Sequence, residues 1–241
     1  MQKNILTDLF QKYIPTKEGD ASGLLLLDLP TGFGKTYSIM EFIYKTYRNH
    51  DKNIIFLTNL KKNLDKNSLQ KFFEANDEIE QYEKDVIFLD SNSDSVIENL
   101  EKVRDEITDD ILNSSAFKNL DYQINTYNRS KENKYQKDFT DFTKNEIRQK
   151  YEPIFRNEVI KFLNDNFTIR KDKIEAIKNF PKYNWIGKLY PAVFTSEKRI
   201  FFMSIKKFLV KNSTIVGSSH SFIDENFLQN AIIIIDEFHF L

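Results

Sequence analysis

The stretch Leu24-Leu25-Leu26-Leu27-Asp28-Leu29-Pro30-Thr31-Gly32-Phe33-Gly34-Lys35-Thr36 decides the fold of this 241-residue chain. A short apolar run leads into a glycine-containing loop, and a Lys-Thr pair follows. The residues after the loop carry apolar side chains at helical spacing, at Ile39, Met40, Ile43, Tyr44 and Tyr47. Strand, loop and helix in this order form the arrangement that a phosphate-binding loop requires.

The chemistry of this loop follows from its residue types. Gly32 and Gly34 let the backbone turn sharply, so that successive N–H groups point at one anion. The helix that begins near Lys35 adds its positive N-terminal end. Lys35 can reach the β- and γ-phosphates of a nucleotide, and the Thr36 hydroxyl can bind Mg²⁺. The expected binding residues are Pro30, Thr31, Gly32, Phe33, Gly34, Lys35 and Thr36.

A second pattern lies at Ala231-Ile232-Ile233-Ile234-Ile235-Asp236-Glu237-Phe238-His239. Four consecutive isoleucines predict a strand that is buried on both faces of a parallel sheet. Asp236 and Glu237 follow at its carboxyl end, where open α/β sheets place their ligands. Asp236 can hold Mg²⁺ directly or through water, and Glu237 can orient and deprotonate an attacking water.

These two patterns together resemble superfamily 2 helicases. The loop resembles their motif I, although Leu29 stands where the general pattern G-x-x-x-x-G-K-[ST] has glycine. Asp236-Glu237-Phe238-His239 resembles their D-E-x-H motif II, and the nearest groups are the restriction-enzyme res subunits and the DEAD/DEAH proteins. The resemblance covers both ends of the chain and little of its middle. It implies ATP and Mg²⁺ as cofactors, Lys35 and Glu237 as catalytic residues, Thr36 and Asp236 at the metal, and His239 coupling the ATP site to a partner domain.

Two further segments resemble motifs that touch the nucleic-acid backbone in this superfamily. The predicted strand 53–59 ends in Thr58 and Asn59 and resembles motif Ia, although both residues are equally suited to capping the next helix. The segment 213–222 reads as an apolar strand that enters Gly217, Ser218 and Ser219, and it resembles motif Ib. The following His220 is expected to be structural or a backbone contact.

Composition narrows the class of protein. The chain has no cysteine, which excludes disulfides and thiolate metal sites, and its net charge of −1 shows no global basic field. Three scattered histidines do not suggest a zinc site. Because neither a signal peptide nor a membrane span is recognisable in the sequence, the expected location is cytoplasmic.

The middle of the chain predicts a largely helical insertion over residues 95–189, which interrupts a RecA-like domain of residues 1–94 and 190–241. Ser95-Val96-Ile97-Glu98 reads as a capping box that opens one amphipathic helix through Ile111. Strands are predicted at 85–90 and 200–204, and a helix at 205–210. The insertion combines a basic stretch with aromatic residues, Tyr122, Tyr127, Tyr135, Phe139, Phe142 and Tyr151. We expect these aromatics chiefly to pack helices together, and contact with single-stranded nucleic acid is the alternative.

The first hypothesis is therefore the N-terminal RecA-like domain of a superfamily 2 helicase or translocase, an α/β P-loop fold. Its partners are nucleic acid, DNA more than RNA, and a second RecA-like domain. The alternative is a nucleotide-binding interaction module, or a split-helicase subunit without turnover of its own. A kinase or a GTPase is disfavoured, because the chain shows neither a lid with clustered arginines nor an Asn-Lys-x-Asp motif.

The first prediction concerns the isolated 241 residues, in which the expected sheet is incomplete. The resemblance places a strand from beyond motif II between the strands of motifs I and II, and arginines of a second domain at the γ-phosphate. Such arginines are worth about 10³–10⁵ in rate in GTPases. Steady-state phosphate release should therefore be negligible with or without DNA, and robust DNA-stimulated hydrolysis would contradict the expected strand order.

Overall fold

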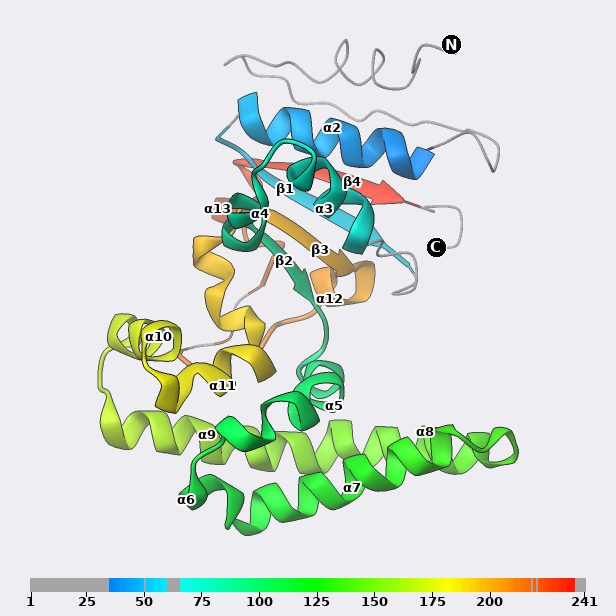
Figure 1. Cartoon of the computed structure of the whole chain (residues 1–241), viewed down its shortest axis with the longest axis vertical. Coiled ribbons are helices and arrows are strands. Elements are labelled where there is room, and N and C mark those ends of the chain that lie inside the picture. The colour runs from blue at the N-terminus through cyan, green and yellow to red at the C-terminus, as the bar shows by residue number, and fades with distance from the viewer. Residues whose placement is uncertain (1–34, 50, 60–65, 218, 220, 237–241) are drawn as a thin grey trace. The chain divides into compact units, whose positions relative to one another are not determined.

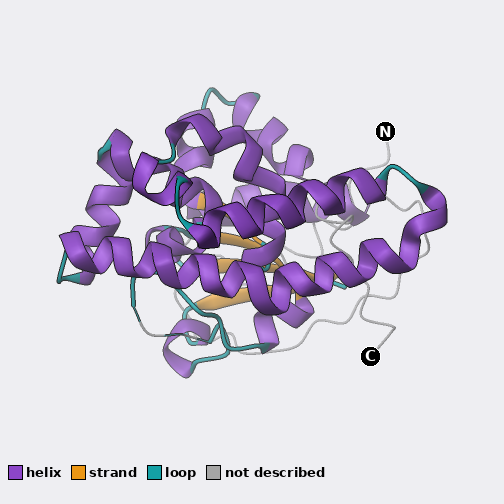
Figure 2. Ribbon diagram, turned by 90° about the horizontal axis from the view of Figure 1, so that it is seen from below, coloured by secondary structure: helices purple, strands orange, loops and turns teal. Residues whose placement is uncertain are grey.

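A computed structural model gives the protein's structure and describes residues 35–49, 51–59, 66–217, 219 and 221–236. The chain divides into two compact units, which are treated separately below. The first unit takes in Met1–Phe88, Glu197–Leu209 and Phe222–Leu241, and the second takes in Leu89–Ser196 and Val210–Ser221. All described strands gather in one sheet, and most of the remaining described chain is helical (Figure 2).

The first unit contains the sheet and the helices that flank it (Figure 1). Its elements are α2 (Lys35–Asn49), β1 (Asn53–Thr58), α3 (Lys66–Glu74), α4 (Ile79–Asp85), β2 (Val86–Leu89), β3 (Ile200–Ser204), α12 (Ile205–Leu209), α13 (Glu225–Leu228) and β4 (Ala231–Asp236). The strand order is β2-β3-β1-β4. A parallel sheet with flanking helices confirms the predicted RecA-like α/β class, and the strands and helix predicted at 53–59, 85–90, 200–204 and 205–210 are present.

Register is fixed along β1, which has a parallel neighbour on each side. Ile55 lies opposite Phe201 of β3 and opposite Ile233 of β4. At the carboxyl end, Thr58 lies opposite Ser204 and opposite Asp236. The polar ends of three strands therefore share one edge of the sheet.

The prediction that β4 is buried on both faces is wrong. Ile233 and Ile235 are 39% and 43% exposed, whereas Ile234 packs against the core of the first unit. Successive side chains of a strand point to opposite faces. One face of β4 therefore covers the core, and the other is open to solvent.

Helix α2 is held against α3 and the start of α4 by an aromatic and ionic cluster. Its side chains Tyr44 and Tyr47 contact Phe73 of α3, with ring centroids 5.0 and 5.6 Å apart. Tyr44 also donates a hydrogen bond of 2.8 Å to Glu78, which pairs with Arg48 at 3.1 Å. These contacts fix the C-terminal half of α2 against its neighbouring helices.

A buried carboxylate also anchors the C-terminal end of this helix. Asp85 is only 4% exposed and accepts hydrogen bonds from the Tyr47 hydroxyl and from Gln81. Burial, with the hydrogen bond to Asp85, raises the pKa of Tyr47 to about 12. The hydroxyl therefore stays protonated, and remains a donor, at every pH below that value.

Tyr47→Phe tests this anchor. Removing the hydroxyl leaves the buried Asp85 carboxylate one donor short, which should cost about 1–3 kcal/mol of unfolding free energy. Chemical denaturation at neutral pH measures the loss. Tyr37→Phe is the matched control, because Tyr37 is 59% exposed on the same helix and should change stability little. Equal losses in both variants would show that Asp85 does not depend on Tyr47.

The second unit is helical in its described part. Its elements are α5 (Asn92–Val103), η2 (Arg104–Glu106), α6 (Asp109–Leu112), α7 (Ser115–Lys131), η3 (Lys134–Gln136), α8 (Lys137–Glu146), η4 (Ile147–Tyr151), α9 (Glu152–Asn166), α10 (Arg170–Asn179), α11 (Pro181–Leu189) and η5 (Pro191–Glu197). The η4 segment is a π-helical turn that joins α8 to α9 without a break. The helices share one apolar core.

The predicted capping box lies one turn too far along the chain. Ser91 is the N-cap of α5, because its hydroxyl oxygen accepts from the Asp94 backbone N–H at 3.2 Å and donates to the Asp94 carboxylate at 2.6 Å. Ser95 lies inside the helix and donates to the Leu189 carbonyl at 2.8 Å. The expected single helix through Ile111 is also interrupted at η2, since Ile107 adopts an extended backbone.

One glycine in the second unit is required by packing. A Cβ at Gly187 of α11 would stand 2.8 Å from the Phe194 ring and 3.0 Å from Ile177. Contacts this short do not occur between real side chains. The absence of a side chain therefore lets α11 approach its neighbours closely.

Candidate functional site

The first candidate site lies at the edge of the sheet where the strands end. Three residues, 50–52, join the end of α2 to the start of β1. A helix of 15 residues is about 22 Å long, and β1, with 6 residues, is about 20 Å long. Because α2 runs back along the strand, its first turn lies over the carboxyl edge of the sheet (Figure 1).

Lys35, Thr36 and Asp236 are the predicted site residues that the structure describes at this edge. Lys35 and Thr36 are the first two residues of α2, half-buried and exposed respectively. Asp236 ends β4 beside Thr58. An ammonium group, a hydroxyl and a carboxylate next to a helix N-terminus fit a phosphate chain with a hard cation such as Mg²⁺.

The other residues predicted for this site lie outside the described part of the chain. These are the loop residues Pro30, Thr31, Gly32, Phe33 and Gly34, and the residues Glu237 and His239 of the second pattern. Their roles stay predictions. The described residues establish that the segments leading to and from them converge on one sheet edge.

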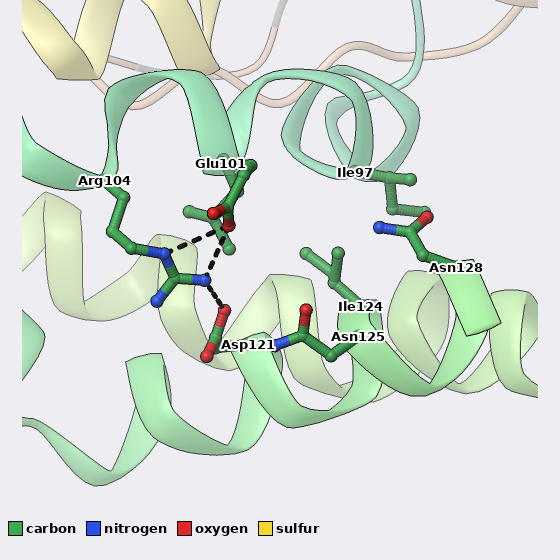
Figure 3. A pocket seen from close by; sticks show the side chains of 8 residues that line it. Ile97, Glu101, Arg104, Asp121, Ile124, Asn125 and Asn128 are labelled. Atoms are coloured by element: carbon green, nitrogen blue, oxygen red, sulfur yellow. Dashed lines mark hydrogen bonds and ion pairs between the residues drawn. The ribbon is translucent and has the colours of Figure 1, made fainter.

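A separate hollow of about 340 Å³ in the second unit does not suit a nucleotide (Figure 3). It lies between α5 and α7, and Arg104 is its cationic side chain. Arg104 forms ion pairs with Glu101, at 2.9 Å, and with Asp121. The hydrogen bond to Asp121 is the main cause of a raised pKa for Arg104, so the cation is stable but already neutralised.

The residues predicted to touch nucleic acid from the motif Ia segment differ in accessibility. Thr58 is fully buried at the end of β1, whereas Asn59 is half-buried. A buried hydroxyl does not reach a phosphate in solvent. The prediction is therefore corrected for Thr58 and stays open for Asn59.

The segment predicted as a strand over 213–216 is not one. Ile215 and Val216 are 3% and 2% exposed and belong to the helical core of the second unit. Gly217 and Ser219 follow as exposed residues, while Ser218 and His220 lie outside the described residues. The apolar pair packs against helices, so no strand neighbour is needed to bury it.

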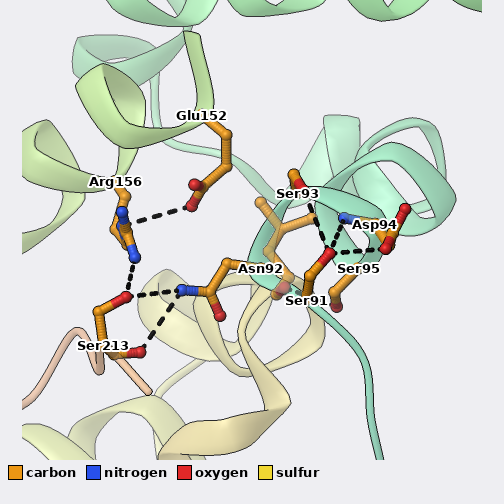
Figure 4. A network of polar contacts seen from close by, with 9 residues as sticks. Ser91, Asn92, Ser93, Asp94, Ser95, Glu152, Arg156 and Ser213 are labelled. Carbon is orange, nitrogen blue, oxygen red and sulfur yellow. Dashed lines mark hydrogen bonds and ion pairs between the residues drawn. The ribbon is translucent and has the colours of Figure 1, made fainter. Parts of the chain in front are cut away.

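Polar contacts hold the start of this segment (Figure 4). The Asn92 side-chain amide donates to the Ser213 carbonyl at 3.4 Å and to its hydroxyl at 3.3 Å. Arg156 of α9 also donates to the Ser213 hydroxyl, and it pairs with the buried Glu152 at 3.4 Å. Burial, reinforced by the Glu152 carboxylate, raises the pKa of Tyr190 well above its usual value, which keeps that hydroxyl neutral.

These anchoring residues could not be predicted from sequence. Asn92 and Arg156 stand 121 and 57 positions away from Ser213. Neither belongs to a recognisable motif, and each reads as a solvated helix residue. The only available signal was the position of Asn92 just after a predicted strand.

Four of the six aromatic residues singled out in the insertion are exposed, so the expectation that they pack helices together is wrong for these four. Tyr122, Tyr135, Phe139 and Phe142 are 68%, 99%, 49% and 62% exposed on α7, η3 and α8. The expectation is confirmed for the other two, because Tyr127 of α7 is buried in the shared core and Tyr151 is partly buried against it. In α8 the buried side chain is that of Thr143, and not an aromatic one.

Comparison with known proteins identifies the family. The family described as type III restriction enzyme, res subunit, matches residues 1–241, the whole chain. The chain belongs to this res-subunit family. Membership makes this chain an ATP-binding, helicase-like module. No curated protein matches the sequence.

Two features are absent from the described residues. No helix among them is long and apolar enough to cross a membrane. No group of three or more histidine or acidic side chains is placed in them to hold a metal ion by itself.

Lys35→Ala should remove most of the affinity for Mg-ATP, because the triphosphate would lose a positively charged hydrogen-bond donor. Isothermal titration calorimetry with the 241-residue chain measures it. Lys45→Ala, on the same helix, is the control: Lys45 is exposed and pairs with Glu41 at 2.8 Å. Unchanged affinity in Lys35→Ala would remove the first turn of α2 from the nucleotide site.

Proposed function

We propose that this chain is the ATP-binding portion of a superfamily 2 motor that couples ATP hydrolysis to movement on nucleic acid, with DNA as the favoured track. The match of the res-subunit family to the whole chain carries the proposal. The convergence of α2 and β4 on one sheet edge supports it, because this is where such a motor needs its phosphate and metal ligands.

The roles divide among the residues of that edge. Lys35 binds the β- and γ-phosphates, and the loop 30–34 supplies backbone N–H groups. Thr36 and Asp236 hold Mg²⁺, which supplies charge neutralisation at the phosphates when it is bound. Glu237 orients the attacking water and accepts its proton, and His239 links the site to a second RecA-like domain.

Nucleic acid is proposed to contact the chain at small polar residues. Asn59 follows β1 in the first unit. Gly217, Ser218 and Ser219 follow the anchored segment of the second unit, and the exposure of Gly217 and Ser219 supports this role. Short side chains and backbone N–H groups can bond phosphates without reading base sequence.

An interaction module without turnover is the second candidate. The exposed aromatic side chains of α7, η3 and α8 favour it, because they are not buried in the shared core and can contact a partner protein. The two candidates differ in whether ATP is hydrolysed once the chain is assembled with a second RecA-like domain.

Glu237→Gln separates them. In an assembly that hydrolyses ATP, the amide cannot accept the proton of water, so turnover should fall by about 10²–10⁴. Binding of Mg-ATP should be retained, and phosphate release with and without single-stranded DNA measures the rate. A variant that turns over normally would place the general base elsewhere, and an assembly without turnover would favour the interaction module.

A further inference from the structure

The exposed segment that follows Val216 has a close neighbour on α10. If Gly217 carried a Cβ, that atom would stand 3.4 Å from Cδ and 3.7 Å from Nε of Arg170. Arg170 is the first residue of α10 and belongs to the same unit. The arginine stem therefore lies beside Gly217, within van der Waals reach.

The guanidinium of Arg170 is available to a ligand. Its side chain is exposed, as is Gly217. In the part of the chain that the structure describes, Arg170 has no hydrogen bond or ion pair, unlike Arg104 and Arg156, which are neutralised by carboxylates. The positively charged guanidinium of Arg170 thus stands beside the exposed Gly217 in the second unit. Lys171, the next residue, is a further exposed cation.

The segment beneath the arginine is held in place. Asn92 and Arg156 bind Ser213, and the two apolar residues before Gly217 are buried. The backbone that leads into Gly217 is therefore held by a packed core, and Arg170 stands beside it. Such preorganisation lowers the entropy lost when a ligand binds both.

We propose that Arg170 binds a backbone phosphate of the nucleic acid that passes over Gly217 and Ser219. This inference rests on the proposed function, because it takes nucleic acid as the partner. The planar guanidinium offers paired donors to phosphate oxygens, while Gly217 allows the strand to approach closely. The helical insertion is then part of the nucleic-acid site.

The test measures binding of fluorescently labelled single-stranded DNA to the full 241-residue chain by anisotropy at several salt concentrations. Arg170→Ala should weaken binding about tenfold, the loss expected for one hydrogen bond to a charged group. The slope of log K against log salt should fall by about one, since one phosphate contact is lost. Arg170→Lys keeps the charge and should keep the slope, but it should lose part of the affinity because an ammonium group cannot offer the paired donors of a guanidinium.

Arg129→Ala is the matched control. Arg129 is an exposed arginine of α7 in the same unit, so its removal changes net charge equally. It should leave affinity and slope unchanged. Thermal unfolding of every variant checks folding, and Arg170→Gln replaces the alanine variant if that variant unfolds.

The outcomes separate this inference from the proposed function. A wild-type chain that binds DNA, with Arg170→Ala showing the wild-type slope, would overturn the role of Arg170 alone. Equal losses in Arg129→Ala and Arg170→Ala would reduce the effect to general charge and overturn it as well. A wild-type chain that binds neither DNA nor RNA would overturn the proposed function, and this inference with it.

Discussion

Parallel hydrogen bonding on both sides of β1 is the constraint on which the structure depends. β1 pairs in register with β3 and with β4, and these strands come from residues 200–204 and 231–236. Neighbouring strands lie about 4.8 Å apart. After β2 the chain leaves the sheet and returns at residue 200 as β3, the neighbour of β2, and most of the helical second unit lies in that stretch.

The same pairing explains where chemistry can occur. Parallel strands end together, so polar residues that follow them meet at one edge. Asp236 and Thr58 are register partners, and α2 brings Lys35 to that edge because its other end is tied to β1 by a short connection. The cluster around Tyr47 and Asp85 stabilises the C-terminal end of this helix, whereas its N-terminal end carries Lys35.

Sequence predicted the parts of this arrangement that follow from local pattern. The apolar spacing of α2 and the runs of β1, β3 and β4 gave correct element types, since each reports burial along a single element. The isoleucine run of β4 misled about exposure, because a run of isoleucines does not say where the strand lies in the sheet. The segment before Gly217 read as a strand, since its two apolar residues bury equally well against helices.

Contacts between residues far apart in the sequence could not be predicted from local sequence patterns. The contact of Arg170 with Gly217 spans 47 positions, and that of Asn92 with Ser213 spans 121. Neither pair has periodicity or a motif. They arise from how α5, α9 and α10 pack, which depends on side-chain volumes throughout the core of the second unit.

The π-helical turn Ile147–Tyr151 has a consequence for the phase of the long helix that contains it. One extra residue in a turn rotates everything after it by about 100° relative to a regular α-helix. The buried face of α9 is thereby rotated back toward the side on which the buried face of α8 lies. Thr143 and Phe155 both lie in the interior, although in a regular helix their side chains would point in different directions. The length of this one turn therefore determines which side chains of α9 are buried together with those of α8.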